Sequence, residues 1–219
     1  LPNSASESWN YAGGITYAGA GGSIGFSLAQ LHNFYGVPIR YSTEPDGESE
    51  QVRIRMDQTR ADLRAVAPIE GPWLDQIKLR AGWADYRHDE IEEDGAIGTS
   101  FFAKGLETRV DLIQTRRGGW DGALGGQMVL RKTSIVGDEK FLPNIDAETY
   151  GLFTLQSLDL GDFRFEAGGR YEHNYLYAKA DDFLNTPETE RSFDTFSASL
   201  GGSYAIMPDW RVGLSVSRT

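Results

Sequence analysis

The chain has 219 residues, a formal net charge of −11 and no cysteine. The missing cysteines exclude disulfide bonds and thiolate-ligated metals, and so acidic a chain is a poor partner for the phosphates of nucleic acid. The mean hydropathy of −0.41, without any apolar run near the roughly 18 residues that a membrane helix needs, excludes a helical span.

Alternation of apolar and polar side chains predicts about ten β-strands, and the 26 glycines and abundant aromatic residues favour β-structure as well. In the clearest segment, 162–178, Phe163 and Phe165 share one face while Arg164 and Glu166 share the other. We expect strands at about residues 7–18, 22–35, 51–65, 74–88, 99–115, 120–134, 148–159, 162–178, 192–206 and 210–219.

Two kinds of break alternate between these strands. The short breaks have the glycine and proline chemistry of hairpin turns; they are 19–22, 68–72, 117–119, 160–162 and 207–209. The longer breaks are acidic and comprise 36–50, 89–98, 136–147 and 179–191. Short turns at one rim and long loops at the other are typical of transmembrane β-barrels.

The length of the strands and the position of the aromatic residues favour the same class of fold. Several strands run for about 15 residues, or roughly 50 Å at about 3.3 Å per residue, whereas strands of globular proteins usually have about 5–6 residues. Aromatic side chains close to the short turns predict one interfacial girdle; they are Tyr17, Trp73, Trp120, Phe163, Tyr204 and Trp210.

The polar face of the predicted sheet carries charges of both signs at mid-strand: Lys78, Arg80, Glu107, Arg109, Asp111, Arg164, Glu166, Arg170 and Glu172. Such a face fits the lumen of a barrel, but the wet face of a soluble β-sandwich that serves as a binding or adhesion module would look the same. The apolar face separates the two alternatives. It meets lipid in a barrel and a second sheet in a sandwich, and its markers are Ile77, Leu79, Trp83, Leu124, Phe165 and Leu200.

Several segments resemble mid-barrel strands of TonB-dependent receptors, and the resemblance runs through most of the chain. The segments are 8–17 (SWNYAGGITY), 22–27 (GSIGFS), 35–38 (YGVP), 57–64 (DQTRADLR), 78–86 (KLRAGWADY), 151–156 (GLFTLQ) and 213–218 (GLSVSR). The nearest branch of the family is the group that includes zinc-uptake receptors.

This resemblance implies an all-β, antiparallel up-and-down meander that forms part of a barrel of about 22 strands in the outer membrane of a Gram-negative bacterium. It also implies TonB-energised uptake of a scarce nutrient, with a metal ion or metal chelate favoured. The expected partners are outer-membrane lipid, a plug domain, TonB and a small nutrient ligand, and no cofactor is expected. Residues 1–4 show no signal peptide. We therefore expect residues 1–219 to be one partial barrel domain that lacks the plug and the C-terminal strands.

Segments 36–50 and 89–98 are expected at the extracellular rim, where clustered carboxylates would concentrate a cation or a cationic chelate. Zinc-uptake members carry His-rich loops, whereas residues 40–50 contain no histidine, and carboxylates suit hard cations better than zinc. The alternative is a solvated loop that only keeps the surface hydrophilic. The candidate residues for ligand capture are Glu44, Asp46, Glu48, Glu50, His88, Asp89, Glu90, Glu92 and Glu93.

No motif of catalysis accompanies these patterns, because the chain has no HExxH, no phosphate-binding loop and no cysteine nucleophile. An outer-membrane protease built on a ten-stranded barrel would need facing Asp and His side chains at the loop rim. Asp85, His88 and His173 are the candidates for such a site. We expect a transporter rather than an enzyme.

Overall fold

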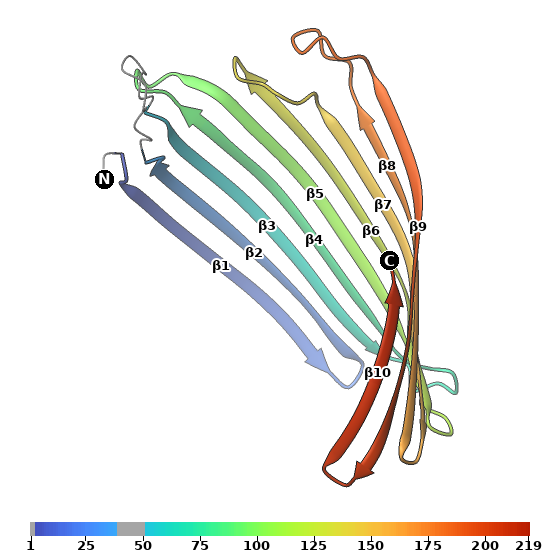
Figure 1. Cartoon of the computed structure of the whole chain (residues 1–219). Helices are drawn as coiled ribbons and strands as arrows, with labels where there is room; N and C mark the ends of the chain where they lie inside the picture. Colours follow the sequence, from blue (N-terminus) through green and yellow to red (C-terminus); the bar gives the residue numbers. More distant parts are fainter. Residues whose placement is uncertain (1–2, 39–50) are drawn as a thin grey trace.

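The computed structural model describes residues 3–38 and 51–219, which form one antiparallel sheet with its strands in the order of the sequence (Figure 1). This is the predicted up-and-down meander. Neither described range contains a helix that could cross a membrane. The ten strands are β1 Ser6–Gly19, β2 Gly22–Gly36, β3 Arg53–Pro68, β4 Leu74–Ile91, β5 Ile97–Gln114, β6 Trp120–Gly137, β7 Ile145–Leu160, β8 Phe163–Ala178, β9 Thr189–Met207 and β10 Trp210–Arg218.

The pairing register separates the side chains of the sheet into two faces. Ile77 lies opposite Leu112, which lies opposite Leu124 on the next strand. We call the face that carries these three residues the outer face and the opposite one the inner face. One position along, Lys78 lies opposite Asp111 on the inner face. All nine charged residues predicted to share the polar face lie on this inner face.

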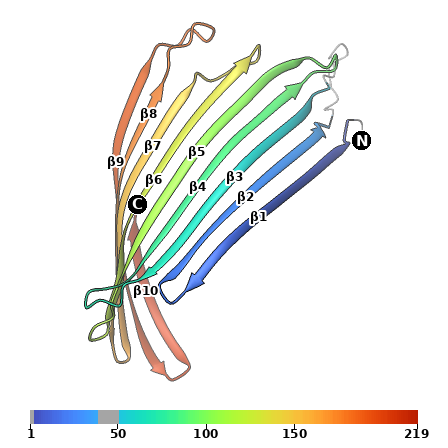
Figure 2. The same ribbon diagram turned by 180° about the vertical axis from the view of Figure 1, so that it is seen from behind.

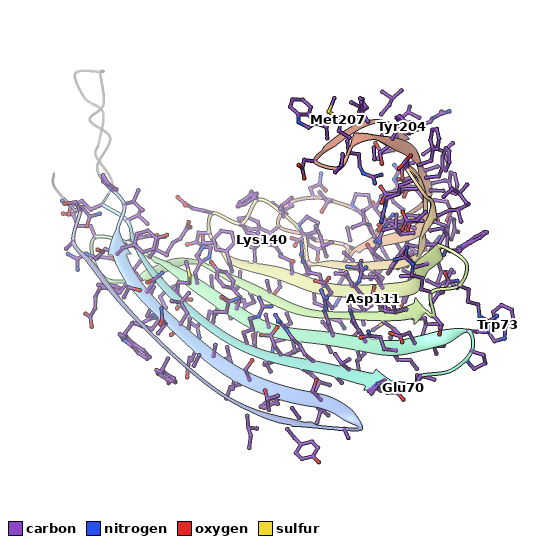
Figure 3. The ribbon with its side chains drawn as sticks, turned by 90° about the horizontal axis from the view of Figure 1, so that it is seen from below. Glu70, Trp73, Asp111, Lys140, Tyr204 and Met207 are labelled. Carbon is purple, nitrogen blue, oxygen red and sulfur yellow. The ribbon has the colours of Figure 1, made fainter. Side chains whose placement is uncertain are left out.

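The sheet is curved, and the inner face is its concave side. Figures 1 and 2 show the sheet from opposite sides as a tilted, twisted wall, and Figure 3 shows it from below as an open arc. On the inner face, Arg170 of β8 donates to Gln127 of β6 at 3.2 Å, across Gly151 of the intervening β7. An inward-curving surface brings such side chains two strands apart closer together, and Gly151 leaves room between them.

The apolar face has no second layer to pack against. Ile54 and Ile135 are the only buried hydrophobic side chains in the described ranges. By contrast, Leu200 is 64% exposed and Phe165 is 48% exposed on the outer face. A β-sandwich would bury such residues between two sheets, and the described residues form a single sheet. The sandwich alternative is therefore wrong, and the wall of a barrel is the structure observed.

The predicted short turns are present, and glycine is required in the one between β5 and β6. Arg117 and Trp120 exchange backbone hydrogen bonds of 2.9 and 2.8 Å, which close the turn. Gly118 and Gly119 have positive φ angles of 56° and 83°, a region that most side chains disfavour. A Cβ on Gly119 would also lie 2.2 Å from the backbone oxygen of Asp159.

Three of the four long breaks at the other rim are shorter than predicted. The break expected at 89–98 shrinks to 92–96, because β4 continues to Ile91 and β5 already begins at Ile97. Acidity alone suggested a loop there. Cross-strand hydrogen bonds keep the acidic residues in the ladder instead, as Asp89 pairs with Ser100 and Glu90 with Thr99. Residues 39–50, most of the break expected at 36–50, lie outside the described residues.

Candidate ligand-capture rim and inner wall

The structure divides the predicted capture residues among different places. Glu44, Asp46, Glu48 and Glu50 lie outside the described residues. Near the end of β4, His88 and Glu90 lie on the inner face, because they pair with Met56 and Ile54 on that side. Asp89 points to the outer face, while Glu92 and Glu93 belong to the connection that follows β4.

The carboxylate of Asp89 is buried and accepts hydrogen bonds from side chains on three adjacent strands. Its side chain is 2% exposed and accepts hydrogen bonds from Ser100 Oγ at 2.6 Å, Arg87 Nε at 3.0 Å and Arg55 Nη2 at 3.0 Å. Two charge-assisted bonds and one hydroxyl satisfy a carboxylate at this depth. Asp89 therefore joins β3, β4 and β5 above the apolar part of the outer face.

His88 belongs to an aromatic cluster on the inner face. Its ring stacks on Phe101 with the centroids 4.2 Å apart, and Phe101 lies 6.0 Å from Phe141 of the β6–β7 connection. The hydroxyl of Tyr86 is 2.8 Å from His88 Nδ1. The sequence indicated His88 as a candidate for ligand capture and for a protease site, but not as a member of an aromatic cluster. The signal for the cluster was the two-residue spacing of Tyr86 and His88.

Neither a metal centre nor a protease site forms from the described residues. Within residues 3–38 and 51–219 no three His, Asp or Glu side chains gather closely enough to hold a metal ion. Asp85 and His173 lie on the outer face, whereas His88 lies on the inner face. Asp85 pairs with Lys104 at 2.9 Å and His173 with Asp194 at 2.8 Å. The three candidate protease residues therefore do not face one another.

Three arginines lie side by side across the middle of the inner wall. Arg64 lies opposite Arg80, which lies opposite Arg109. Asp111 neutralises Arg109 at 2.8 Å, but no carboxylate pairs with Arg64 or Arg80 in the part of the chain that the structure describes. These side chains line a cavity of about 190 Å³. Like charges directly opposite each other are destabilising. The carboxylates of Asp62 and Glu107 line the same cavity and offset part of this repulsion without forming an ion pair with Arg64 or Arg80.

An ion pair joins two of the rim connections. Lys140 follows β6 and Asp181 follows β8, and the ammonium of Lys140 donates to the carboxylate of Asp181. Figure 3 shows Lys140 over the hollow of the arc. The hydrogen bond from Lys140 lowers the pKa of Asp181, and the backbone amide of Leu184 adds to the effect. The sequence offered no signal for this pair, because its members are 41 residues apart.

We expect the Lys140–Asp181 contact to weaken in acid. A carboxyl with a lowered folded-state pKa contributes its stabilisation fully above the unfolded value of about 3.9, and loses it as the pH falls through the folded value. At neutral pH, Lys140→Gln should therefore make the 179–188 connection more accessible to limited proteolysis. Lys132→Gln, a change of the same charge on β6, is the control. Equal cleavage rates for both variants would contradict the link.

The outer face carries a second aromatic girdle, which the sequence patterns did not predict. Tyr11, Tyr150 and Tyr171 each direct a hydroxyl to a polar neighbour on this face, with Gln30, Glu148 and Asp194 as acceptors at 2.6, 2.7 and 2.7 Å. The hydroxyls mark where the apolar surface ends, since tyrosine prefers a boundary between apolar and wet surroundings. The signal was present in the spacing of the tyrosines from the short turns.

The two girdles enclose an apolar belt whose height approaches the roughly 25 Å of the apolar band on outer-membrane barrels. On β8 the belt runs from Phe163 to Tyr171, eight residue steps, or about 26 Å of strand at about 3.3 Å per residue. At the usual barrel tilt of about 40°, this is about 20 Å across the bilayer. A curved meander with an apolar outer belt and a charged inner face is a wall segment of a large transmembrane β-barrel.

The chain belongs to the TonB-dependent receptor family, since the family model "TonB dependent receptor-like, beta-barrel" matches residues 3–219. No curated protein matches the chain. Similar solved structures include an open form of the ferric-catecholate import receptor Fiu from E. coli K12, with a TM-score of 0.72 and 13% identity. The copper transporter OprC (0.70, 11%) and the ferric citrate transporter FecA in its unliganded form (0.66, 13%) are also similar.

The match covers 97% of this chain for Fiu, 98% for OprC and 99% for FecA. The chain spans less than half of each of these proteins, namely 46% of Fiu, 37% of OprC and 36% of FecA. At these identities the likeness shows the fold alone. The three structures therefore support the assignment of this chain as a barrel wall. The activity of the whole receptor is inferred below from the surfaces of this chain.

Proposed function

We propose that this chain forms part of the barrel wall of an outer-membrane receptor that imports a metal ion or a metal chelate. TonB energises the import, and a plug domain outside this chain closes the lumen. The single observation that carries the proposal is the apolar belt between two girdles, on a chain of this family. The protein acts as a transporter and has no catalytic role.

The choice of a metal or metal chelate has two supports. Fiu, OprC and FecA are named for import of ferric catecholate, copper and ferric citrate. The inner wall offers fixed charges of both signs at mid-height, including the unpaired Arg64 and Arg80. Carboxylates of the plug, or those of a passing anionic chelate, would bind to these two arginines. Zinc stays among the candidates through the sequence resemblance to the zinc-uptake branch.

Growth of a deletion strain identifies the nutrient. The strain lacking the full receptor is grown under separate limitation for iron, copper, zinc, cobalamin and carbohydrate. We expect a growth defect under limitation for one metal and rescue by the intact gene. A defect under carbohydrate limitation alone would overturn the choice of a metal, while leaving the receptor class in place.

The acidic rim should raise the capture rate of a cationic ligand. Replacing Glu44, Asp46, Glu48 and Glu50 by serine removes four charges, and electrostatic steering of this kind changes association rates by about tenfold or more. We expect the uptake rate at limiting nutrient to fall by about tenfold, and the loss to shrink at high salt. Glu92→Ser with Glu93→Ser tests the neighbouring connection in the same assay.

The control for the rim variants lies at the opposite end of the wall. Asp162→Ser and Asp209→Ser remove acidic residues from two short turns and should leave the uptake rate unchanged. Unchanged uptake in all the rim variants would leave the rim acids with the role of keeping the surface hydrophilic. If the nutrient is an anionic chelate, removal of the acidic residues should raise the uptake rate above that of the wild type.

A further inference from the structure

A long apolar groove crosses the outer face above the short turns of β6 to β10. It has a volume of about 770 Å³, and its side walls are Trp120, Leu158, Phe165, Leu200, Leu214 and Val216. All of these side chains lie on the outer face in the pairing register. Ala167 and Gly202, which also line the groove, supply a floor of small residues. A flexible hydrocarbon chain fits a surface of this chemistry.

A second, smaller pocket continues the groove toward the short turns between β3 and β4 and between β5 and β6. It has a volume of about 370 Å³, and it shares Trp120 and Gln156 with the groove. Trp120 Nε1 donates to Gln156 Oε1 at 2.8 Å, which holds the indole between the two spaces. Trp73 and Arg117 lie at the far end of this pocket. Figure 3 shows Trp73 at the margin of the sheet.

Arg117 is fixed in place, yet its charge is not neutralised. Its guanidinium stacks over the ring of Trp73 with the Cζ 4.1 Å from the ring centroid. Stacking occupies the flat face of a guanidinium and leaves the N–H donors at its edge available. Throughout residues 3–38 and 51–219, no carboxylate pairs with Arg117. The preceding Arg116 differs, because Asp159 on the inner face accepts from it at 2.7 Å.

Backbone contacts hold both partners of this stack. The closed turn between Arg117 and Trp120 fixes the arginine. On the other side, Thr115 N donates to Trp73 O at 3.1 Å, and Thr115 Oγ1 donates to Gly71 O at 2.7 Å. The β3–β4 turn is therefore tied to the end of β5. A cation prepared in this way binds an anion without much further loss of side-chain entropy.

We propose that this groove and the Arg117–Trp73 pair form one binding site for a glycerophospholipid. An acyl chain lies in the apolar groove, and the lipid phosphate accepts hydrogen bonds from the edge of the Arg117 guanidinium. Charge complementarity selects this occupant, because Arg117, which lines the adjoining pocket at the level of the short-turn girdle, is a cation without a carboxylate partner among the described residues. The inference rests on the membrane placement proposed above and goes beyond it by assigning a specific lipid subsite.

Retention of a defined lipid by the purified full-length receptor tests the site. The receptor is delipidated in a non-ionic detergent, dipalmitoyl phosphatidylglycerol is added, and the bound lipid is counted by native mass spectrometry. Arg117→Gln should lower the apparent affinity by about tenfold, as expected for loss of a charge-assisted bond to phosphate. Ala167→Trp fills the floor of the groove and should also abolish specific retention. Arg116→Gln, the same change directed at the inner face, should retain lipid like the wild type.

The following results separate the possible outcomes. Glycerophosphoglycerol, which lacks acyl chains, should not bind; binding that equals the lipid would assign the site to a free phosphate and overturn the proposal. Equal retention by Arg117→Gln and Arg116→Gln would mean that lipid adheres to the apolar belt without a subsite. Nutrient uptake by Arg117→Gln should match the wild type. A wild-type receptor that takes up its nutrient normally but does not retain the lipid would refute only the lipid site. A wild-type receptor that is recovered in the soluble fraction without detergent would refute the membrane placement itself.

Discussion

Replacing Leu200 by arginine should prevent the intact receptor from accumulating in the outer membrane. Leu200 lies on the outer face opposite Ala167, which stands midway between Phe163 and Tyr171 on β8. Arginine on the lipid face of a barrel costs about 2–4 kcal/mol at the bilayer midplane. This is a large part of the stability of a typical protein domain. The amount of folded receptor in membrane fractions is the first measurement, and urea titration in detergent is the second.

The neighbouring Ser199 provides the matched control. It is one residue away but lies on the inner face, opposite Gly168 and Ser217, where glycine leaves room for a longer side chain. Ser199→Arg should fold and insert with less than about half of the loss seen for Leu200→Arg. If both variants accumulated equally, the outer face at this height would not be in contact with lipid, and the assignment of the two faces would be wrong.

Gly119→Val should strongly destabilise the turn between β5 and β6. Valine at a φ of 83° is strained, and its Cβ would meet the backbone oxygen of Asp159. Asp159 pairs with Arg164 in the β7–β8 ladder and donates its amide to Gly119 O at 2.9 Å, and both contacts limit its movement. Conformational strain alone costs about 1–3 kcal/mol, and the clash adds to it. We expect the denaturation midpoint of the receptor in urea to fall markedly.

The adjacent Gly118 shows what the turn itself tolerates. Its φ of 56° is left-handed, but a Cβ at this position meets nothing within 4 Å. Gly118→Asn should therefore cost well under about 1 kcal/mol, because asparagine visits this region readily. A Gly119→Val variant as stable as Gly118→Asn would show that the turn can open away from Asp159.

The strands were predictable because their signal is repeated over many residues. Each of the ten predicted strands is present, and β8 differs from its predicted range by one residue at its start. The two-residue period assigned each side chain to a face, since a slip by one residue would invert the whole pattern. The ends of β4 and β5 were predicted less well. Asp89 and Glu90 have the composition of a loop, and only the pairing partners Arg55 and Ser100 explain why they remain in the ladder.

The contacts that build the surfaces were hidden from the sequence for a related reason. Residues that touch across the wall, such as Arg109 and Phe153, are brought together by the register of three strands and by the small Gly125 between them. The alternation of apolar and polar residues predicts the face on which a residue lies. Its position along the barrel axis, relative to residues on a strand two places away, depends on the register set by every intervening turn. The arginine row and the Lys140–Asp181 pair both depend on such positions.

The sequential order of the strands has a consequence for how this wall can be assembled and altered. Every ladder joins two strands that follow each other in the sequence. In the β3–β4 ladder, the pair farthest from the turn is Arg53 and Ile91, which are still on consecutive strands. Contacts this local favour growth one hairpin at a time, with each new strand templated on the edge of the last. The same modularity lets a connection at the rim lengthen during evolution without shifting the register elsewhere.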